Sequence, residues 1–370
     1  IPQGRLSAPI AVPFVDDHGV ARKRELAITP AVSVALEPGE QIIPVTNATA
    51  TSIRVGLAST MSATPSGDLR LELPAGWRAE PEKLTFALPK RGDQKDTDFK
   101  VQPGNLKESR ANVQATAETG GKTYNEQYTL VTREDLGSYY FYQPAVQHVS
   151  IVDVRVPKEL KVGYIMGAGD DIPTVLRQIG MNVTLIPAEK VGSEDLSAYR
   201  SIVLGVRAYE TQPDLVKNNQ KLLDFVSSGG TLVVQNNNDV GEFNGAHLTP
   251  YPATLSRERV SVEEAPVQIL APEDPIFHTP NEITQKDFDG WVQERGLYFM
   301  SSWDDHFKPL LSCHDPGEAD QKGGLLAAKY GKGIYIYTGY AFFRQLPAGE
   351  PGAIRLFVNL VSAGKEAASH

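Results

Sequence analysis

The chain contains a single cysteine, Cys313, among 370 residues. One thiol cannot form an internal disulfide or a cysteine-based zinc cluster, although it can still serve as a nucleophile. In the segment KPLLSCHD a histidine and an aspartate follow the thiol directly, but adjacent residues of a strand point to opposite faces. We therefore predict a buried or incidental thiol and no working triad at this position.

The sequence also lacks a basic block and a long apolar run. Its net charge is −9, and the densest basic segments, residues 21–25 and 89–95, are short and isolated, so we expect no nucleic-acid partner. The apolar runs are much shorter than the about 20 residues that a spanning helix needs, so we expect no membrane span. The sequence starts at Ile1-Pro2 without methionine, which favours a processed chain or a fragment of a longer protein.

The first third of the chain has the pattern of an all-β domain. Residues 1–27 are rich in proline and predict an extended lead-in segment. Across residues 28–133, apolar and polar residues alternate in short runs separated by Pro, Gly and Asn, which predicts an immunoglobulin-like antiparallel sandwich. Trp77 follows a Pro-x-Gly turn, and we predict that it packs in the core rather than stacking on a sugar.

Residues 134–158 are predicted to link two domains. They contain four consecutive aromatic residues, Tyr139 to Tyr142. Two interpretations remain open, a docking surface for a ligand and packing between the domains, and the second needs fewer assumptions.

Residues 159–370 predict an α/β domain. Short Val/Ile/Leu-rich runs stop at glycines, acids or amides and alternate with amphipathic stretches, which is typical of a flavodoxin-like parallel sheet with helical crossovers. The predicted strands are residues 162–166, 182–187, 201–205 and 231–235, and the predicted helices are residues 171–178, 215–227 and 353–361. Asp171 is predicted to cap the first of these helices. A hairpin turning at residues 331–333 is expected near the end of the chain.

Polar side chains follow the predicted parallel strands, and ligands of such sheets bind at the carboxyl ends of the strands. The candidate binding residues are Asp170, Asp171, Arg207, Tyr209, Asn236, Asn238 and Trp303. Carboxylates, an arginine, amides and aromatic rings suit the hydroxyl groups and apolar face of a sugar. The alternative is that these groups satisfy one another and the loop backbone.

No metal, cofactor or nucleotide site is predicted. Asp170-Asp171 has no preceding histidine, and residues 303–306 are neighbours on one predicted turn without matching ligands elsewhere. The glycine-rich segment 167–171 lacks the lysine and serine of a phosphate loop, and its two aspartates would repel phosphate.

Two parts of the sequence resemble known families. The segment LPAGWRAEP with LTFALP and FKVQP resembles the alpha-galactosidase-associated sandwich module of bacterial carbohydrate-active enzymes, which implies an accessory domain without chemistry. YRSIVLG, LLDFVSSGGTLVV, PEDPIFHTPN and GKGIYIYTG resemble the class I glutamine amidotransferase-like superfamily, particularly its noncatalytic branch related to ThuA-like and beta-galactosidase trimerisation domains.

More closely, GYIMGAGDDIP, GVRAYE, QNNND and DFDGWVQERGLYF resemble the region after the catalytic domain of large bacterial PIG-L (LmbE-like) deacetylases. The resemblance implies a longer parent whose zinc-dependent deacetylase domain, marked by a His-Pro-Asp-Asp motif missing here, lies N-terminal to this chain. Export from the cytoplasm is also implied.

The amidotransferase resemblance implies that an active member would place a cysteine directly after the strand at 231–235. This chain has Asn236 to Asn238 there, and asparagine offers no atom for a base to activate. We therefore expect a noncatalytic accessory region that aids carbohydrate recognition or domain assembly. Two alternatives are a hydrolase of N-acetyl sugars or glycosides using Asp170 and Asp171, and a purely structural or oligomerisation module.

Overall fold

The computed structural model describes residues 11–15, 18–25, 29–47, 49–61, 64–104, 106–133 and 137–364. The chain divides into two compact units. The first contains residues 1–40, 48–106 and 110–149, and the second contains residues 41–47, 107–109 and 150–370. Among the described residues, no helix combines the length and apolar character needed to cross a membrane.

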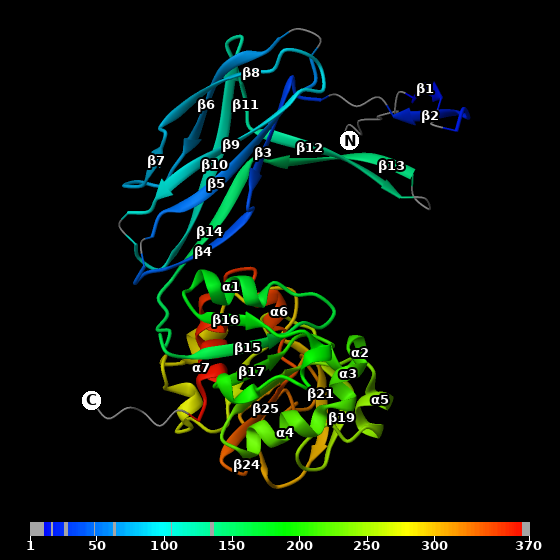
Figure 1. Cartoon of the computed structure of the whole chain (residues 1–370), viewed down its shortest axis with the longest axis vertical. Coiled ribbons are helices and arrows are strands. Elements are labelled where there is room, and N and C mark those ends of the chain that lie inside the picture. Colours follow the sequence, from blue (N-terminus) through cyan, green and yellow to red (C-terminus); the bar gives the residue numbers. More distant parts are fainter. Residues whose placement is uncertain are drawn as a thin grey trace. The chain divides into compact units, whose positions relative to one another are not determined.

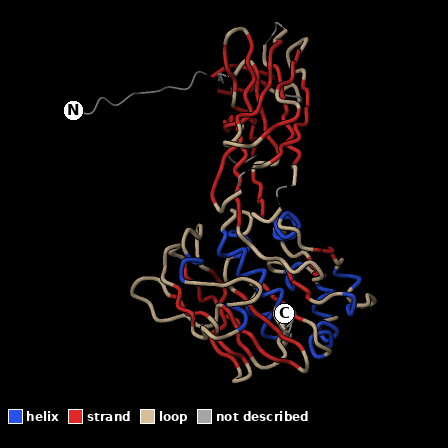
Figure 2. The backbone as a smooth tube through the Cα atoms, turned by 90° about the vertical axis from the view of Figure 1, so that its left-hand side faces the viewer, coloured by secondary structure: helices blue, strands red, loops and turns tan. Residues whose placement is uncertain are grey.

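The strands before residue 153 form two main antiparallel layers (Figures 1 and 2). One sheet has the order β3 (Val32–Glu37), β5 (Thr51–Ser59), β9 (Gln94–Gln102) and β7 (Arg78–Glu80). The other has the order β4 (Glu40–Pro44), β14 (Val146–Val152), β10 (Ser109–Thr119), β6 (Ser66–Glu72) and β8 (Lys83–Ala87), with β11 (Lys122–Tyr124) paired to β10.

The alternation seen in the sequence sets the faces of these strands. In β5, Ile53, Val55 and Leu57 are buried, whereas Arg54 between them is exposed. Successive strand residues point to opposite sides, so the apolar set faces the core. Trp77 is also buried, which confirms its predicted place in the core.

Strands occupy two regions for which the sequence predicts irregular connections. β1 (Ala11–Val15) and β2 (Ala21–Glu25) pair antiparallel within the predicted lead-in segment, whose residues 1–10, 16–17 and 26–27 lie outside the described residues. In the predicted linker, β13 (Gly137–Pro144) pairs with β12 (Glu126–Arg133), and β14 lies between β4 and β10. β-Branched residues account for β14, because Val149, Ile151 and Val152 gain burial within a sheet.

The aromatic run of the predicted linker lies on the two-stranded ribbon of β12 and β13. Side chains of Tyr139, Phe141 and Tyr142 are 42–50% exposed. These side chains are exposed because a ribbon of two strands carries no second layer of structure over them.

The second unit is built on a seven-stranded sheet (Figure 1). Its order is β16 (Asn182–Leu185), β15 (Lys161–Ile165), β17 (Ser201–Leu204), β18 (Thr231–Gln235), β25 (Gly333–Thr338), β24 (Leu325–Tyr330) and β22 (Phe307–Pro309). The first five strands are parallel to one another, β24 pairs antiparallel with β25, and β22 pairs antiparallel with β24. The parallel pairing predicted from the sequence is therefore present, and the hairpin of β24 and β25 lies at the expected place.

Helices cover both faces of this sheet. The α-helices are α1 (Ile172–Gln178), α2 (Ala208–Thr211), α3 (Pro213–Lys217), α4 (Asn219–Ser227), α5 (Val240–Gly245), α6 (Phe342–Gln345) and α7 (Pro351–Ser362). The 3-10 helices are η1 (Ala188–Lys190), η2 (Leu196–Ala198), η3 (Pro275–Phe277) and η4 (Gln285–Phe288). Val233 joins the apolar cluster that includes α1 and α7, and its neighbours Leu232 and Val234 join the cluster that includes α3 and α4.

The predicted helix over residues 215–227 is divided in two. α3 ends at Lys217, and the Asn218 side chain donates a hydrogen bond to the Asp214 carbonyl at 2.8 Å. Asparagine side chains compete in this way with helical backbone bonds, which accounts for the break. The remaining pairs of the second unit are β19 (Ala253–Val260) with β21 (Gly296–Trp303) and β20 (Val267–Ile269) with β23 (Leu311–Cys313).

A buried asparagine pair joins α7 to the segment after η3. Asn359 Nδ2 donates to the carbonyls of Ile276 and Asn281 at 2.8 and 2.7 Å. Asn359 Oδ1 accepts from the backbone and side-chain nitrogens of Asn281, each at 3.0 Å. Both side chains are almost completely buried, so each lost bond leaves a partner away from water.

We expect Asn359→Ala to lower the free energy of unfolding by about 2–4 kcal/mol, because it strands several buried polar groups. Urea unfolding followed by circular dichroism measures this change. Gln220→Ala is the matched control, since its amide makes one exposed hydrogen bond to Asp224, and we expect a change below about 0.5 kcal/mol. Equal effects of the two substitutions would contradict the role given to Asn359.

Candidate functional site

The predicted strand-end loops do meet at the carboxyl edge of the sheet. The Ala168 nitrogen donates to the Val206 carbonyl at 2.7 Å, and the Arg207 nitrogen donates to the Asn236 carbonyl at 2.8 Å. A side chain at Gly167 would place its Cβ 1.9 Å from the Val206 oxygen. The loops after β15, β17 and β18 are therefore held together backbone to backbone, and only glycine permits this approach at position 167.

Asp170 ties two of these loops to the sheet. Its Oδ1 accepts from the Tyr164 hydroxyl at 2.7 Å and from the Ile172 nitrogen at 3.2 Å. Its Oδ2 accepts from the Val206 nitrogen at 3.3 Å. Burial raises the pKa of Asp170 above its ordinary value and outweighs the opposing effect of these hydrogen bonds.

Asp171 has a smaller structural role than the sequence suggests. It occupies the N-cap position of α1, but its exposed side chain makes no capping bond, and Asp170 accepts from the helix instead. The prediction that Asp171 caps α1 is wrong in this detail. The reason is that a carboxylate one residue earlier already reaches the first free nitrogen of the helix.

The end of β18 and the two residues after it contain three buried amide oxygens without a hydrogen-bond partner among the described residues: Gln235 Oε1, Asn236 Oδ1 and Asn237 Oδ1. Their amide nitrogens are already used. Gln235 Nε2 donates to the Tyr164 hydroxyl at 2.9 Å, and Asn237 Nδ2 donates to the Gln235 carbonyl at 3.0 Å. The oxygens can accept hydrogen bonds from water or from a ligand with donors, but an amide cannot act as a nucleophile or a general base at neutral pH.

Arg207 and Asn238 both contact Glu210, a residue that the sequence pattern does not indicate as part of the site. Arg207 adopts a left-handed conformation with φ of 59°, and its Nε donates to Glu210 Oε2 at 2.7 Å. The other Glu210 oxygen accepts from the backbone nitrogens of Asn238 and Asp239. The arginine and the asparagine loop are therefore engaged with a shared carboxylate.

The two aromatic candidates differ in exposure. Tyr209 is 2% exposed, its hydroxyl donates to Asn219 Oδ1 at 2.7 Å, and its ring packs edge-on against Phe243. Trp303 ends β21 opposite Ala253, is partly buried and packs against the apolar cluster that includes Phe243. Tyr209 therefore offers almost no surface to a ligand, and the binding role of Trp303 stays a prediction.

The remaining chemical groups form no catalytic arrangement within the described ranges. Cys313 lies 3.2 Å from the Tyr340 hydroxyl, while His314 Nδ1 contacts the Asp315 carbonyl at 2.9 Å. Asp304 Oδ1 accepts from the His306 nitrogen at 3.0 Å, which confirms the predicted turn. No group of three or more described His, Cys, Asp or Glu residues is arranged to hold a metal ion.

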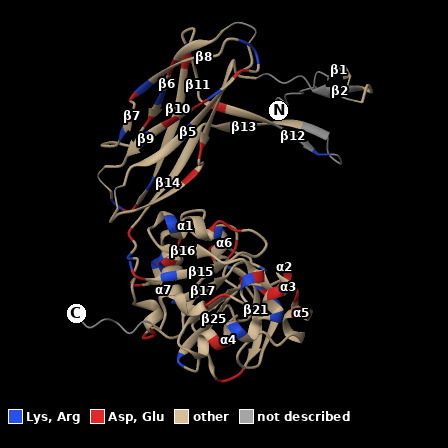
Figure 3. Ribbon diagram, viewed as in Figure 1, with Lys and Arg blue, Asp and Glu red and all other residues tan. Residues whose placement is uncertain are grey.

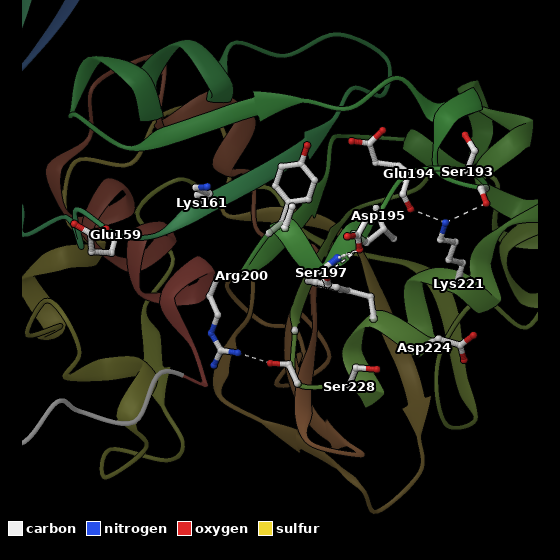
Figure 4. A pocket seen from close by; sticks show the side chains of 17 residues that line it. Glu159, Lys161, Ser193, Glu194, Asp195, Ser197, Arg200, Lys221, Asp224 and Ser228 are labelled. Atoms are coloured by element: carbon white, nitrogen blue, oxygen red, sulfur yellow. Dashed lines mark hydrogen bonds between the residues drawn. The ribbon is translucent and has the colours of Figure 1, made fainter.

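A groove lies at the opposite, amino edge of the sheet (Figure 4). It has a volume of about 1080 Å³ and runs beside the starts of β15, β17 and β18. Tyr199 lines it together with the loop over residues 192–198 and residues of α4. Charged residues of both signs are spread over the described parts of both units (Figure 3), and the lining of the groove also includes both signs.

Sequence comparisons identify no matching family model and no matching curated protein. Among solved structures, beta-galactosidase from Rahnella sp. R3 aligns with 16% identity and a TM-score of 0.34, covering 55% of this chain and 32% of its own. Exo-beta-1,4-mannosidase from Opitutaceae bacterium strain TAV5 aligns with 12% identity and a TM-score of 0.35, covering 57% and 37% respectively. The chain thus spans about a third of the length of these two enzymes, and TM-scores this low support no inference about it.

The Asp170 network predicts a pH-dependent effect of Asp170→Asn. The substitution replaces one carboxylate oxygen by an amide NH₂ group, which cannot accept the hydrogen bond made there. It should therefore lower the free energy of unfolding by about 1–3 kcal/mol. The pKa of Asp170 in the folded state is raised above 3.8. Its contribution to the free energy of unfolding is therefore full at acid pH and falls as the pH rises through this folded-state pKa. Urea unfolding of both proteins between pH 3.5 and about 7 should show the difference shrinking with pH. A difference that grows with pH would contradict this prediction.

Cys313 is expected to be unreactive in the folded protein. Burial raises the pKa of its thiol to about 11, so the thiolate is scarce at neutral pH, and the sulfur is 1% exposed. Titration with a thiol-reactive chromogenic disulfide should give no reaction at pH 8 until urea unfolds the chain. Rapid modification of the native protein would refute the assignment of a buried thiol.

Proposed function

We propose that this chain is a noncatalytic accessory region of a PIG-L-type (LmbE-like) deacetylase that helps to recognise a carbohydrate substrate. In this proposal the sandwich is an accessory module, and the second unit is a flavodoxin-like domain of the class I glutamine amidotransferase-like type. The strand order of β16, β15, β17, β18 and β25 supports the fold assignment, because flavodoxin-like sheets have the order 2-1-3-4-5.

One observation carries the noncatalytic part of the proposal. Three asparagines, Asn236 to Asn238, directly follow β18, where an active amidotransferase-like enzyme needs its nucleophile. Loss of such a nucleophile lowers the rate by on the order of 10⁶. The nearby Asp170 carboxylate accepts three hydrogen bonds from its own chain, so it is a structural group rather than a free general base.

Carbohydrate recognition is supported by the kinds of side chain that line two grooves, and it requires no reactive group. Polar and aromatic side chains occur together in grooves of both units, and sugars present hydroxyl groups and an apolar ring face to such surfaces. The deacetylase chemistry belongs, in this proposal, to a preceding domain with its own zinc site.

Calorimetric titration of the whole chain with N-acetylglucosamine oligomers tests the proposal. We expect saturable binding with a dissociation constant of about 1 mM or lower, equivalent to about −4.1 kcal/mol. No heat with any of a panel of neutral glycans would refute recognition and favour a structural or oligomerisation module, which light scattering would then identify by a stable oligomer.

The same panel tests the hydrolase alternative. We expect no release of acetate or of reducing sugar from N-acetyl sugars and glycosides. Release that disappears in Asp171→Ala would refute the noncatalytic assignment, because Asp171 is exposed and its side chain makes no capping bond.

A further inference from the structure

The groove at the amino edge of the sheet has walls that the chain itself holds in place. Lys221 Nζ donates to the carbonyls of Gly192 and Glu194 at 3.0 and 2.6 Å, joining α4 to the opposite loop (Figure 4). Asp195 Oδ1 accepts from the nitrogen and hydroxyl of Ser197 at 3.0 and 2.7 Å. A groove whose walls are already ordered loses less conformational freedom when a ligand binds.

A second set of hydrogen bonds orders the part of the groove at the starts of β17 and β18. The Arg200 guanidinium donates to the carbonyls of Gly229 and Gly364, so it joins the starts of β17 and β18 to the end of the C-terminal helix. This arginine is therefore engaged with neutral acceptors of its own chain. Its charge is held at the floor of the groove by the backbone and not by a carboxylate partner.

Tyr199 provides a flat apolar surface inside the groove. Its ring lies against Gly163, where an added Cβ would come within 3.3 Å of the ring carbon Cγ. The side chain is half-buried and lines the groove, and among the described residues none makes a hydrogen bond to its hydroxyl. The ring is supported at the sheet by Gly163, and the hydroxyl keeps its hydrogen-bonding capacity for a ligand.

The charges of the groove nearly cancel. Three cationic side chains, Lys161, Arg200 and Lys221, lie with four anionic side chains, Glu159, Glu194, Asp195 and Asp224. Such a lining has no strong preference for an anion or a cation. Donors and acceptors around an aromatic ring instead match a neutral ligand that offers many hydroxyl groups and an apolar face.

We infer that this amino-edge groove binds a neutral saccharide, with one sugar ring stacked on Tyr199 and its hydroxyl groups bonded to Lys161 and Glu194. The inference rests on the proposed role in carbohydrate recognition and gives that role a location. The volume of about 1080 Å³ accommodates more than one ring, since ordinary small-molecule pockets measure about 300–1,000 Å³. The ligand class is therefore an oligosaccharide without net charge.

A smaller groove on the sandwich offers a competing location. It has a volume of about 270 Å³ and lies on the outer face of β3, β5 and β9, with Tyr128 of β12 at its side. Tyr128 stacks at an angle with Tyr140 and Tyr142, at ring distances of 5.9 and 6.4 Å. The amino-edge groove is favoured because it is larger and because hydrogen bonds across it hold its walls.

Titration of the whole chain with the N-acetylglucosamine tetramer, and with neutral cello- and manno-oligosaccharides, tests the inference. Tyr199→Ala should weaken binding about tenfold, and Tyr199→Phe, which keeps the ring, should weaken it less than about threefold. Tyr139→Ala is the matched control, since Tyr139 is 50% exposed outside both grooves, and it should bind as the unmodified chain does.

Lys161→Ala gives a second readout that does not depend on packing, because Lys161 is exposed and its loss should leave the thermal midpoint unchanged. We expect it to weaken binding about threefold, as loss of one hydrogen bond at a wet site does. Unchanged affinity in both Tyr199→Ala and Lys161→Ala would overturn the groove assignment while leaving carbohydrate recognition in place. Loss of binding in Tyr128→Ala instead would move the site to the sandwich, and absence of binding by the unmodified chain would overturn both proposals.

Discussion

The contact between the loops after β15 and β17 is the constraint on which the carboxyl edge of the sheet depends. Gly167 lies so close to the Val206 carbonyl that no side chain fits between them, and Asp170 receives hydrogen bonds from both loops. Polar groups that a sequence pattern assigns to a ligand are therefore used to hold backbone together. Buried polar groups must be satisfied before they are free to bind anything else.

Much of the scaffold could be predicted because burial leaves a direct pattern in the sequence. β18 has the predicted limits, and β15 and β17 differ from theirs by one residue, since each is a run of apolar residues ended by polar or turn residues. β13 and β14 were missed as strands because tyrosines and a histidine interrupt the apolar alternation. The break after α3 depends on one asparagine side chain, which residue propensities alone do not resolve.

The candidate site could be predicted only as a set of loops. Their meeting at one edge follows from parallel strands, but the direction of each side chain does not. Tyr209 turns inward to Asn219, and Glu210, adjacent in the sequence, turns to Arg207. The amino-edge groove left no signal of its own, because Lys161, Tyr199 and Lys221 belong to three segments that only tertiary packing brings together.

The two edges of the sheet differ in what they leave free. At the carboxyl edge, three amide oxygens lack donors among the described residues, while Asp170, Glu210 and Arg207 are engaged with their own chain. At the amino edge, Tyr199, Lys161 and Glu194 line a groove. A ligand gains most where binding costs little ordering and breaks no internal hydrogen bond. This difference is the physical reason why the proposed saccharide site is sought at the amino edge and not at the carboxyl edge.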